Sequence, residues 1–384
     1  MNTAVDVTQD ICFQIADLKF QAKELNDTNA TERLKNILIN RKALPLLQAL
    51  AKDLPSIAVT LEETDTLKAS NDQELASIEE KIKDAEQNLG ESEVQEALVA
   101  RADFLARIGS FQEAIDAYEK AESHAVGVGS KLDILFVILR LGLAGFISKK
   151  LLAKTLERSK DLVENGGDWE RRNRLKVYEA TYLFQKRDFK AASKLLLDSL
   201  ATFSAYEVHS YSQFIFYTIL SSLIAVDRPT LKTQVVTSPE VLSCASQLKT
   251  VFGLLNGLVL CNYHQFMNAL LGLFGELEHD RYLKPHNFYI IRELRIVAYH
   301  QFLISYQSVT LEAMAKAFGF SQSFLDKELA RFIVSGRINC KIDRVQGVIE
   351  TNRPDTRNSL YQQTIKQGDV VLNKIQKLSR FIDI

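Results

Sequence analysis

Cysteine is scarce in this 384-residue sequence, which has only four, at positions 12, 244, 261 and 340. No two of them form a C-x-x-C pair, so the sequence offers neither a disulfide framework nor a cysteine-based zinc site. Thiols that stay free are typical of a reducing compartment. We therefore expect an intracellular protein without a structural metal.

Proline and glycine are also rare, with six and sixteen residues. This scarcity disfavours turn-rich all-β folds and favours long helices. Long apolar runs are missing too: the strongest, Ile134 to Ile147, is interrupted by Arg140 and is shorter than the roughly 20 residues of a membrane span. The first ten residues lack a basic stretch followed by an apolar core, so we expect no secretory signal and no membrane contact.

An excess of charge of one sign is absent, since 47 basic and 48 acidic side chains leave a net charge of −1. This balance disfavours a nucleic acid as the main partner. The charge is unevenly placed: twelve acidic and three basic residues lie between Glu62 and Glu96, in a segment with helical spacing of its apolar residues. The segment from Lys284 to the last residue contains fifteen basic and nine acidic residues. Such blocks predict solvated helix faces.

A degenerate repeat is present in the middle of the chain. Phe111 is followed by Ala114, Tyr118 and Ala121, and Phe189 by Ala192, Leu196 and Ser199, at the same offsets. A small residue lets two helices of a hairpin approach each other, and a large one fills the groove of the next hairpin. A weaker third copy begins at Tyr263, with Phe266 in place of the small residue. The pattern resembles tetratricopeptide repeats, with unrelated amphipathic hairpins as the alternative.

After residue 310 the pattern changes to that of a winged helix. Thr310 is the predicted N-cap of one helix, and Gly319 is its predicted end. A second helix is predicted to extend to Ser335. Ile338, Cys340 and Ile342 then alternate with polar residues, and a return strand follows a turn at Gly347. We expect this hairpin to bury one face in its own domain and to offer a backbone edge to a neighbouring subunit. Its predicted interface residues are Ile338, Cys340 and Ile342.

The C-terminal tail carries an apolar stripe with helical spacing. Tyr361, Gly368, Ile375 and Ile382 are seven residues apart. We expect Gly368-Asp369 to break this helix and to cap its second half. The predicted interface residues of the tail are Val371, Leu372, Ile375, Leu378 and Ile382.

Catalytic motifs are missing. Gly127 to Lys131 lacks the spacing of a phosphate-binding loop, and Ser246 to Lys249 lacks the companion motifs of acyl-enzyme hydrolases. The six histidines include no H-x-H or H-E-x-x-H pair, so a metalloisopeptidase site is excluded. We expect no enzymatic activity, no cofactor, no metal and no small-molecule substrate.

Two surface features leave open what the protein binds. The start of the second winged-helix segment, which would read DNA bases, contains Asp326 and Glu328 against one lysine, and this disfavours contact with phosphate. The cluster Arg171-Arg172-Asn173-Arg174 near the single Trp169 lies close to an expected helix start, where cations oppose the helix dipole. An acidic partner and a solvated face are both consistent with this cluster.

Helical repeats followed by a winged helix and a terminal helix resemble the PCI family, named for the proteasome lid, the cullin-deneddylating signalosome and a translation initiation factor. Long runs are similar to those of a PCI subunit of the lid. These runs are Gly166 to Tyr178, Cys340 to Asp343, Glu350 to Asp355 and Gln376 to Arg380.

The resemblance implies a mainly α protein, in which a right-handed superhelix of tetratricopeptide-like hairpins precedes a winged-helix PCI domain with a small β-hairpin and a C-terminal helix. The expected segments are an N-terminal helical region (1–95), the repeats (96–283), the PCI winged helix (284–356) and a C-terminal bundle helix (357–384). The family's lid subunits are scaffolds that associate through their winged helices and gather their C-terminal helices in a bundle.

The implied partners are other PCI subunits and metalloisopeptidase-type subunits of the lid, and the implied location is the cytoplasm and the nucleus. Two alternatives are a PCI scaffold subunit of the signalosome and an initiation-factor-type subunit that contacts RNA. The near-neutral charge disfavours the second.

Overall fold

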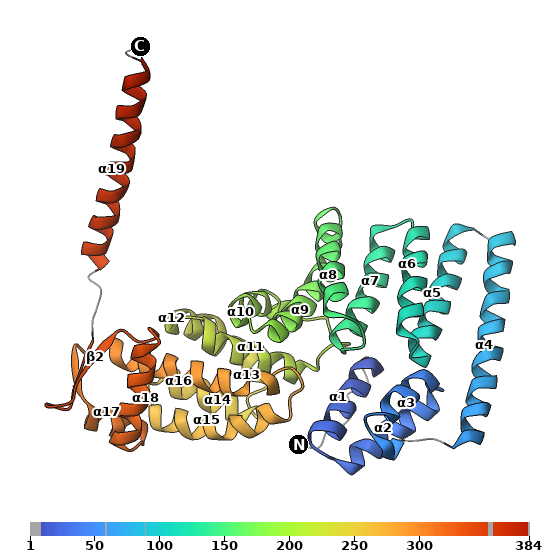
Figure 1. Ribbon diagram of the computed structural model, residues 1–384, viewed down its shortest axis with the longest axis horizontal. Helices are drawn as coiled ribbons and strands as arrows, with labels where there is room; N and C mark the ends of the chain where they lie inside the picture. Colours follow the sequence, from blue (N-terminus) through green and yellow to red (C-terminus); the bar gives the residue numbers. More distant parts are fainter. Residues whose placement is uncertain (1–8, 58–59, 89, 352–355, 383–384) are drawn as a thin grey trace. The chain divides into compact units, whose positions relative to one another are not determined.

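The computed structural model describes residues 9–57, 60–88, 90–351 and 356–382. Within them the chain is mainly helical, with nineteen α-helices and one three-stranded sheet (Figure 1). It divides into two compact units. The first comprises residues 1–255 and 269–291, and the second comprises residues 256–268 and 292–384. The predicted fold class, helical hairpins followed by a winged helix, is confirmed; the predicted segment boundaries at 95, 283 and 356 remain predictions.

The helices follow one another with short connections. Those up to the middle of the chain are α1 (Ile11–Glu24), α2 (Thr28–Asn40), α3 (Leu44–Ala51), α4 (Leu61–Asn88), α5 (Glu91–Ile108), α6 (Phe111–His124), α7 (Val128–Leu143), α8 (Lys149–Glu164), α9 (Trp169–Lys186) and α10 (Phe189–Asp198). The later ones are α11 (Tyr211–Ala225), α12 (Arg228–Leu231), α13 (Pro239–Ser243), α14 (Lys249–Val259), α15 (Tyr263–Glu278), α16 (Asn287–Ile304), α17 (Leu311–Phe318), α18 (Gln322–Val334) and α19 (Thr356–Ile382).

The repeat motifs form helical hairpins as predicted. Gly109, with φ 94°, ends α5 in the left-handed conformation and lets α6 turn back beside it. Ala114 in α6 and Ala192 in α10 are completely buried, as expected for the small residues of the repeat. In the third copy the small residue lies on the other helix: a Cβ on Gly257 of α14 would lie 3.0 Å from Phe266 of α15. The hairpin therefore exists, with the two residue sizes exchanged between its helices.

The N-terminal helices pack within the first unit. Phe13 and Ala16 of α1 belong to one buried cluster with Leu132 and Phe136 of α7 and Tyr178 of α9. The predicted acidic helix is α4, which lies beside α5 (Figure 1) and buries Ile82 and Ala85 while most of its charged side chains stay exposed.

The second unit contains the winged helix. Its strands are β1 (Ser308–Thr310), β2 (Cys340–Asp343) and β3 (Val348–Thr351), all antiparallel in the order β1-β3-β2. Thr310 Oγ1 accepts a hydrogen bond from the Ala313 amide at 3.2 Å, which confirms the predicted cap of α17. The sequence predicted the β2–β3 hairpin but missed β1, because three residues are too few to show an alternating pattern.

The C-terminal helix corrects one prediction. α19 runs from Thr356 to Ile382 without a break, so Gly368-Asp369 does not divide it. A single glycine costs a helix only about 1 kcal/mol relative to alanine, which the helix-forming residues on both sides outweigh.

Candidate protein–protein interface

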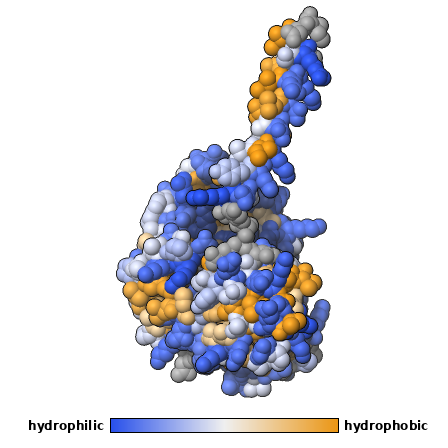
Figure 2. Space-filling view, turned by 90° about the vertical axis from the view of Figure 1, so that its left-hand side faces the viewer, coloured by the Kyte–Doolittle hydropathy of each residue, from blue (hydrophilic) through white to orange (hydrophobic). Residues whose placement is uncertain are grey.

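The predicted interface residues of the tail form an exposed apolar stripe on α19. Every side chain of this helix whose burial is described, residues 357–380 and Ile382, is exposed. The five predicted residues are each 54% to 73% exposed: Val371, Leu372, Ile375, Leu378 and Ile382. Figure 2 shows the apolar residues gathered along one side of this helix and polar residues along the other. The stripe therefore lacks the burial that normally stabilises an amphipathic helix.

The stripe is longer than the sequence prediction of the site. Leu360, Tyr361 and Ile365 are also more than 60% exposed and lie on the same side by helical spacing. The signal that could have found them was already present in the seven-residue spacing that starts at Tyr361. Because we expected a break at Gly368, the predicted site was confined to the second half of the helix.

The predicted interface residues of the hairpin have a different environment. The side chains of Ile338 and Cys340 are buried in the second unit, and Ile342 is half-buried. Burial raises the pKa of the Cys340 thiol to about 11, so it remains protonated at neutral pH. Ile338 and Cys340 therefore belong to the core of the second unit. Contact with a partner would instead involve the backbone edge of an outer strand, β1 or β2.

The carboxylates of α18 do not face solvent as the sequence suggested. Glu328 is buried, with its oxygens 2.6 Å from Arg295 Nη1 and 2.6 Å from the Tyr299 hydroxyl. Asp326 lies 3.2 Å from Arg344 Nη2. The exposed face of α18 thus carries Lys327 and Arg331 rather than acidic groups. The carboxylates are no obstacle to phosphate there, and the expected lack of nucleic-acid binding remains a prediction on other grounds.

Two arginines of the cluster near Trp169, Arg171 and Arg174, form ion pairs within the chain. The Arg171 guanidinium lies 2.7 Å and 2.6 Å from the carboxylates of Asp133 and Asp168. Gly129 provides the space, because a Cβ there would lie 3.3 Å from the guanidinium. Asn173 is buried, and only Arg172 of the cluster is exposed. Arg171 therefore joins the start of α9 to α7, which neither sequence interpretation of the cluster had anticipated.

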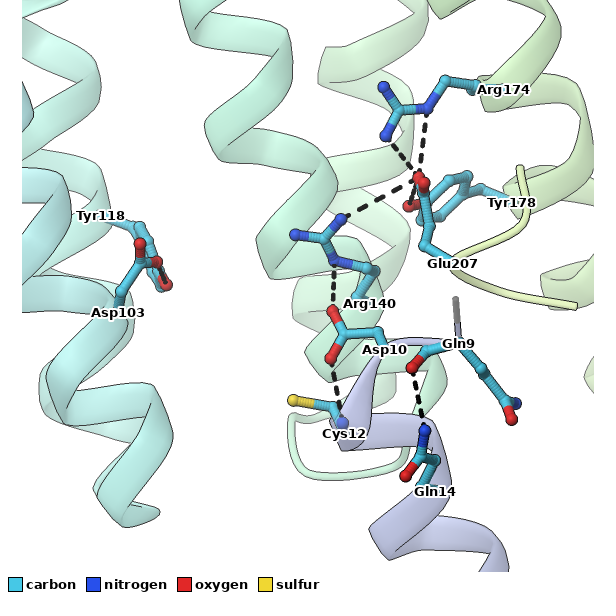
Figure 3. A network of polar contacts seen from close by, with 10 residues as sticks. All are labelled: Gln9, Asp10, Cys12, Gln14, Asp103, Tyr118, Arg140, Arg174, Tyr178 and Glu207. Atoms are coloured by element: carbon cyan, nitrogen blue, oxygen red, sulfur yellow. Dashed lines mark hydrogen bonds and ion pairs between the residues drawn. The ribbon is translucent and has the colours of Figure 1, made fainter. Parts of the chain in front are cut away.

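A network of polar contacts connects α1 with α7 and α9 (Figure 3). Arg140, which interrupts the apolar run of α7, lies 2.9 Å from the Asp10 carboxylate and 3.9 Å from the Glu207 carboxylate. Glu207 also accepts hydrogen bonds from the Tyr178 hydroxyl at 2.6 Å and from Arg174 Nε at 3.1 Å. These charges neutralise one another, so the network secures packing and offers no free group for chemistry.

Among the described residues, no group of three or more histidine, cysteine, aspartate or glutamate side chains could hold a metal ion. A hollow of about 370 Å³ on α18 is shallow and lined by Ala330, Arg331, Val334 and Ser335. No described helix is long and apolar enough to cross a membrane.

Comparison with protein families agrees with this architecture. A model of "26S proteasome subunit RPN7" matches residues 62–234, and a PCI domain model matches residues 274–353. A model of the "26S proteasome regulatory subunit RPN7/PSMD6 C-terminal helix" matches residues 361–382, which lie within α19.

The proteasome relatives are similar over most of their length. The 26S proteasome non-ATPase regulatory subunit 6 homolog of Arabidopsis thaliana is 50% identical over 83% of this chain and 82% of its own. The Dictyostelium discoideum subunit 6 is 43% identical over 96% and 97%. COP9 signalosome complex subunit 1 of Arabidopsis thaliana is 27% identical over only 48% and 42%. The chain therefore belongs to the family of 26S proteasome non-ATPase regulatory subunit 6, the RPN7/PSMD6 family, and contains its PCI domain.

Proposed function

We propose that this protein is a non-catalytic scaffold subunit of the proteasome regulatory-particle lid, where it supports ubiquitin-dependent protein degradation. The observation that carries the proposal is the apolar stripe of α19, exposed along the whole helix. Exposed apolar side chains in such a continuous row are typical of a surface that a partner covers.

The width of the stripe favours a bundle of several helices. In a heptad that begins at Tyr361, the apolar side chains occupy the first, fourth and fifth positions, as Val371, Leu372 and Ile375 illustrate. A two-stranded coiled coil needs only the first and fourth positions, whereas three positions of seven form the broader face of a helix within a bundle. The partners of α19 are accordingly C-terminal helices of other subunits.

The winged helix supplies a second attachment. Its outer strands β1 and β2 each have one edge that β3 does not cover, and such edges can pair with a strand of a neighbouring subunit. The proposed partners are other PCI subunits and metalloisopeptidase-type subunits of the lid. The proposed location is the cytoplasm and the nucleus.

The test replaces apolar residues of the stripe in the full-length chain. Leu372→Asp with Ile375→Asp places two charges on the apolar side, and the control Gln362→Asp with Asn373→Asp places two on the polar side of α19. Each version is expressed in cells with an affinity tag, and co-purifying proteins are identified by mass spectrometry.

We expect the original chain and the control to co-purify with proteasome lid subunits, and the stripe variant to lose at least about 90% of them, since a buried unpaired charge is strongly unfavourable. Full retention of lid subunits by the stripe variant would contradict the proposal. Recovery of signalosome subunits in place of lid subunits would assign the chain to the other complex.

A further inference from the structure

Gly368 lies at the centre of the apolar stripe of α19, and we infer that it is the point at which a partner helix approaches most closely. The partner is an amphipathic helix of a neighbouring subunit, and it inserts a large apolar side chain into the notch that Gly368 leaves. This inference rests on the proposed function, because it specifies how the stripe binds its partner.

The backbone of α19 does not require glycine at this position. Gly368 lies inside an uninterrupted helix and is not among the glycines with positive φ. A glycine within a helix raises the free energy of that helix relative to alanine, because glycine loses more backbone freedom on folding. Conformation therefore gives no reason for glycine here.

Packing within the chain does not require glycine either, since a Cβ added to Gly368 would meet nothing within 4 Å. Other glycines inside helices of this chain show what close helix packing looks like. Four of them would place a Cβ within 3.3 Å of an atom of a neighbouring helix: Gly142, Gly253, Gly257 and Gly272. Gly368 shares with these four only its place inside a helix, and like Gly275 of α15 it has no such neighbour within the chain.

The position of Gly368 on the helix defines the shape of the notch. Tyr361 and Ile375 lie seven residues before and after it on the same face, and Thr364 lies one turn before it. The middle of the stripe thus has two short residues, Thr364 and Gly368, beside the larger Ile365. The distance between two packed helices depends on the side chains at the crossing, so the shortest distance is reached at Gly368.

The surroundings of the notch identify the chemistry of what fills it. The charged neighbours Lys366 and Asp369 lie away from the stripe by helical spacing, so the notch itself is apolar. The backbone groups of α19 are already hydrogen-bonded within the helix, so a β-strand cannot add to it. A helix that carries a leucine, isoleucine, methionine or aromatic residue fits both conditions.

Gly368→Leu is a sharp test because two models of the stripe predict opposite results. If the stripe only needs apolar area, an added leucine extends it and strengthens binding. If Gly368 is a close-approach point, the leucine fills the notch and separates the helices. Leucine is also a better helix former than glycine, so poorer folding of α19 cannot explain a loss of binding.

The variants are made in the full-length chain and expressed with an affinity tag beside the untagged original in the same cells. Hydrogen exchange of the purified free chain reports the stability of α19, and mass spectrometry reports the fraction incorporated into the lid. Asn373→Ala is the matched control, because it also improves helix propensity but lies on the polar side of α19.

We expect both variants to slow hydrogen exchange in α19. Gly368→Leu should reduce incorporation roughly tenfold, whereas Asn373→Ala should leave it unchanged. Incorporation of Gly368→Leu equal to or above that of the original chain would overturn the inference. If Leu372→Asp with Ile375→Asp loses the lid while Gly368→Leu keeps it, the notch is wrong and the proposed function stands; if neither variant loses the lid, both fail.

Discussion

Single alanines set the distance between helices in the repeat hairpins. Ala114 and Ala192 have no exposed surface, and each occupies the position at which the repeat requires a small side chain. Protein interiors are packed as densely as organic crystals, so extra methylene groups at such a position must displace their neighbours.

We predict that Ala114→Leu and Ala192→Leu each lower the free energy of unfolding by about 1–3 kcal/mol through overpacking. Ala100→Leu is the control, because Ala100 belongs to the same hairpin as Ala114 but is exposed. Thermal or urea unfolding measures the difference. If the buried variants unfold like the exposed one, the repeat register inferred from the sequence is wrong.

His209 is a buried histidine that stays neutral. Its Nε2 lies 2.8 Å from Thr181 Oγ1, and the rings of Tyr217 and Tyr282 pack against it with centroids 5.0 and 5.9 Å away. Burial, helped by the positive charge of Arg281, lowers the pKa of His209 to about 3. In the unfolded chain the same histidine titrates near pH 6.5.

Because the unfolded state takes up the proton first, the stability that His209 contributes is present above about pH 6.5 and is lost as the pH falls towards 3. We predict a loss of about 2 kcal/mol from this residue between pH 8 and pH 5. His209→Gln retains a polar partner for Thr181 and should have a smaller decrease in melting temperature over this range. An equal decrease in both proteins would contradict the prediction.

Among the elements, α18 shows that binding depends on which side chains a helix exposes and not on its overall composition. Asp326 and Glu328 are engaged in ion pairs within the second unit, while Lys327 and Arg331 remain on the exposed face. Two cations could contact about two phosphates, which supports only weak, salt-sensitive association with nucleic acid.

We predict that the full-length chain shows no sequence-specific binding to duplex DNA at about 200 mM salt, as measured by fluorescence anisotropy. Any binding at lower salt should disappear in Lys327→Ala with Arg331→Ala and persist in Lys316→Ala, a lysine on α17. A complex that survives about 200 mM salt would show that α18 reads DNA after all.

At the scale of the whole molecule, α19 is the helix that we propose to serve assembly rather than the stability of the free chain. Its described side chains are all exposed, so they add no buried apolar area to either unit. We predict that deletion of residues 369–384 leaves the melting temperature of the free chain unchanged and abolishes incorporation into the lid. A large drop in melting temperature would mean that this segment packs on the chain's own core.

Local patterns in the sequence determined much of this protein. Helical spacing of apolar residues, the cap at Thr310, the turn at Gly347 and the stripe of α19 each depend on residues a few positions apart, and each was predicted. The long runs similar to those of a lid PCI subunit indicated the family, and the comparisons confirm it.

Only the tertiary structure decided which polar groups meet. Asp10 contacts Arg140, Arg171 contacts Asp133, and Glu328 contacts Arg295, pairs that lie far apart along the chain. It also decided that β1 pairs with β3. A sequence pattern fixes which face of a helix is polar, but the partner of a buried charge depends on which distant segment folds against it, because desolvation makes an unpaired charge costly wherever it is buried.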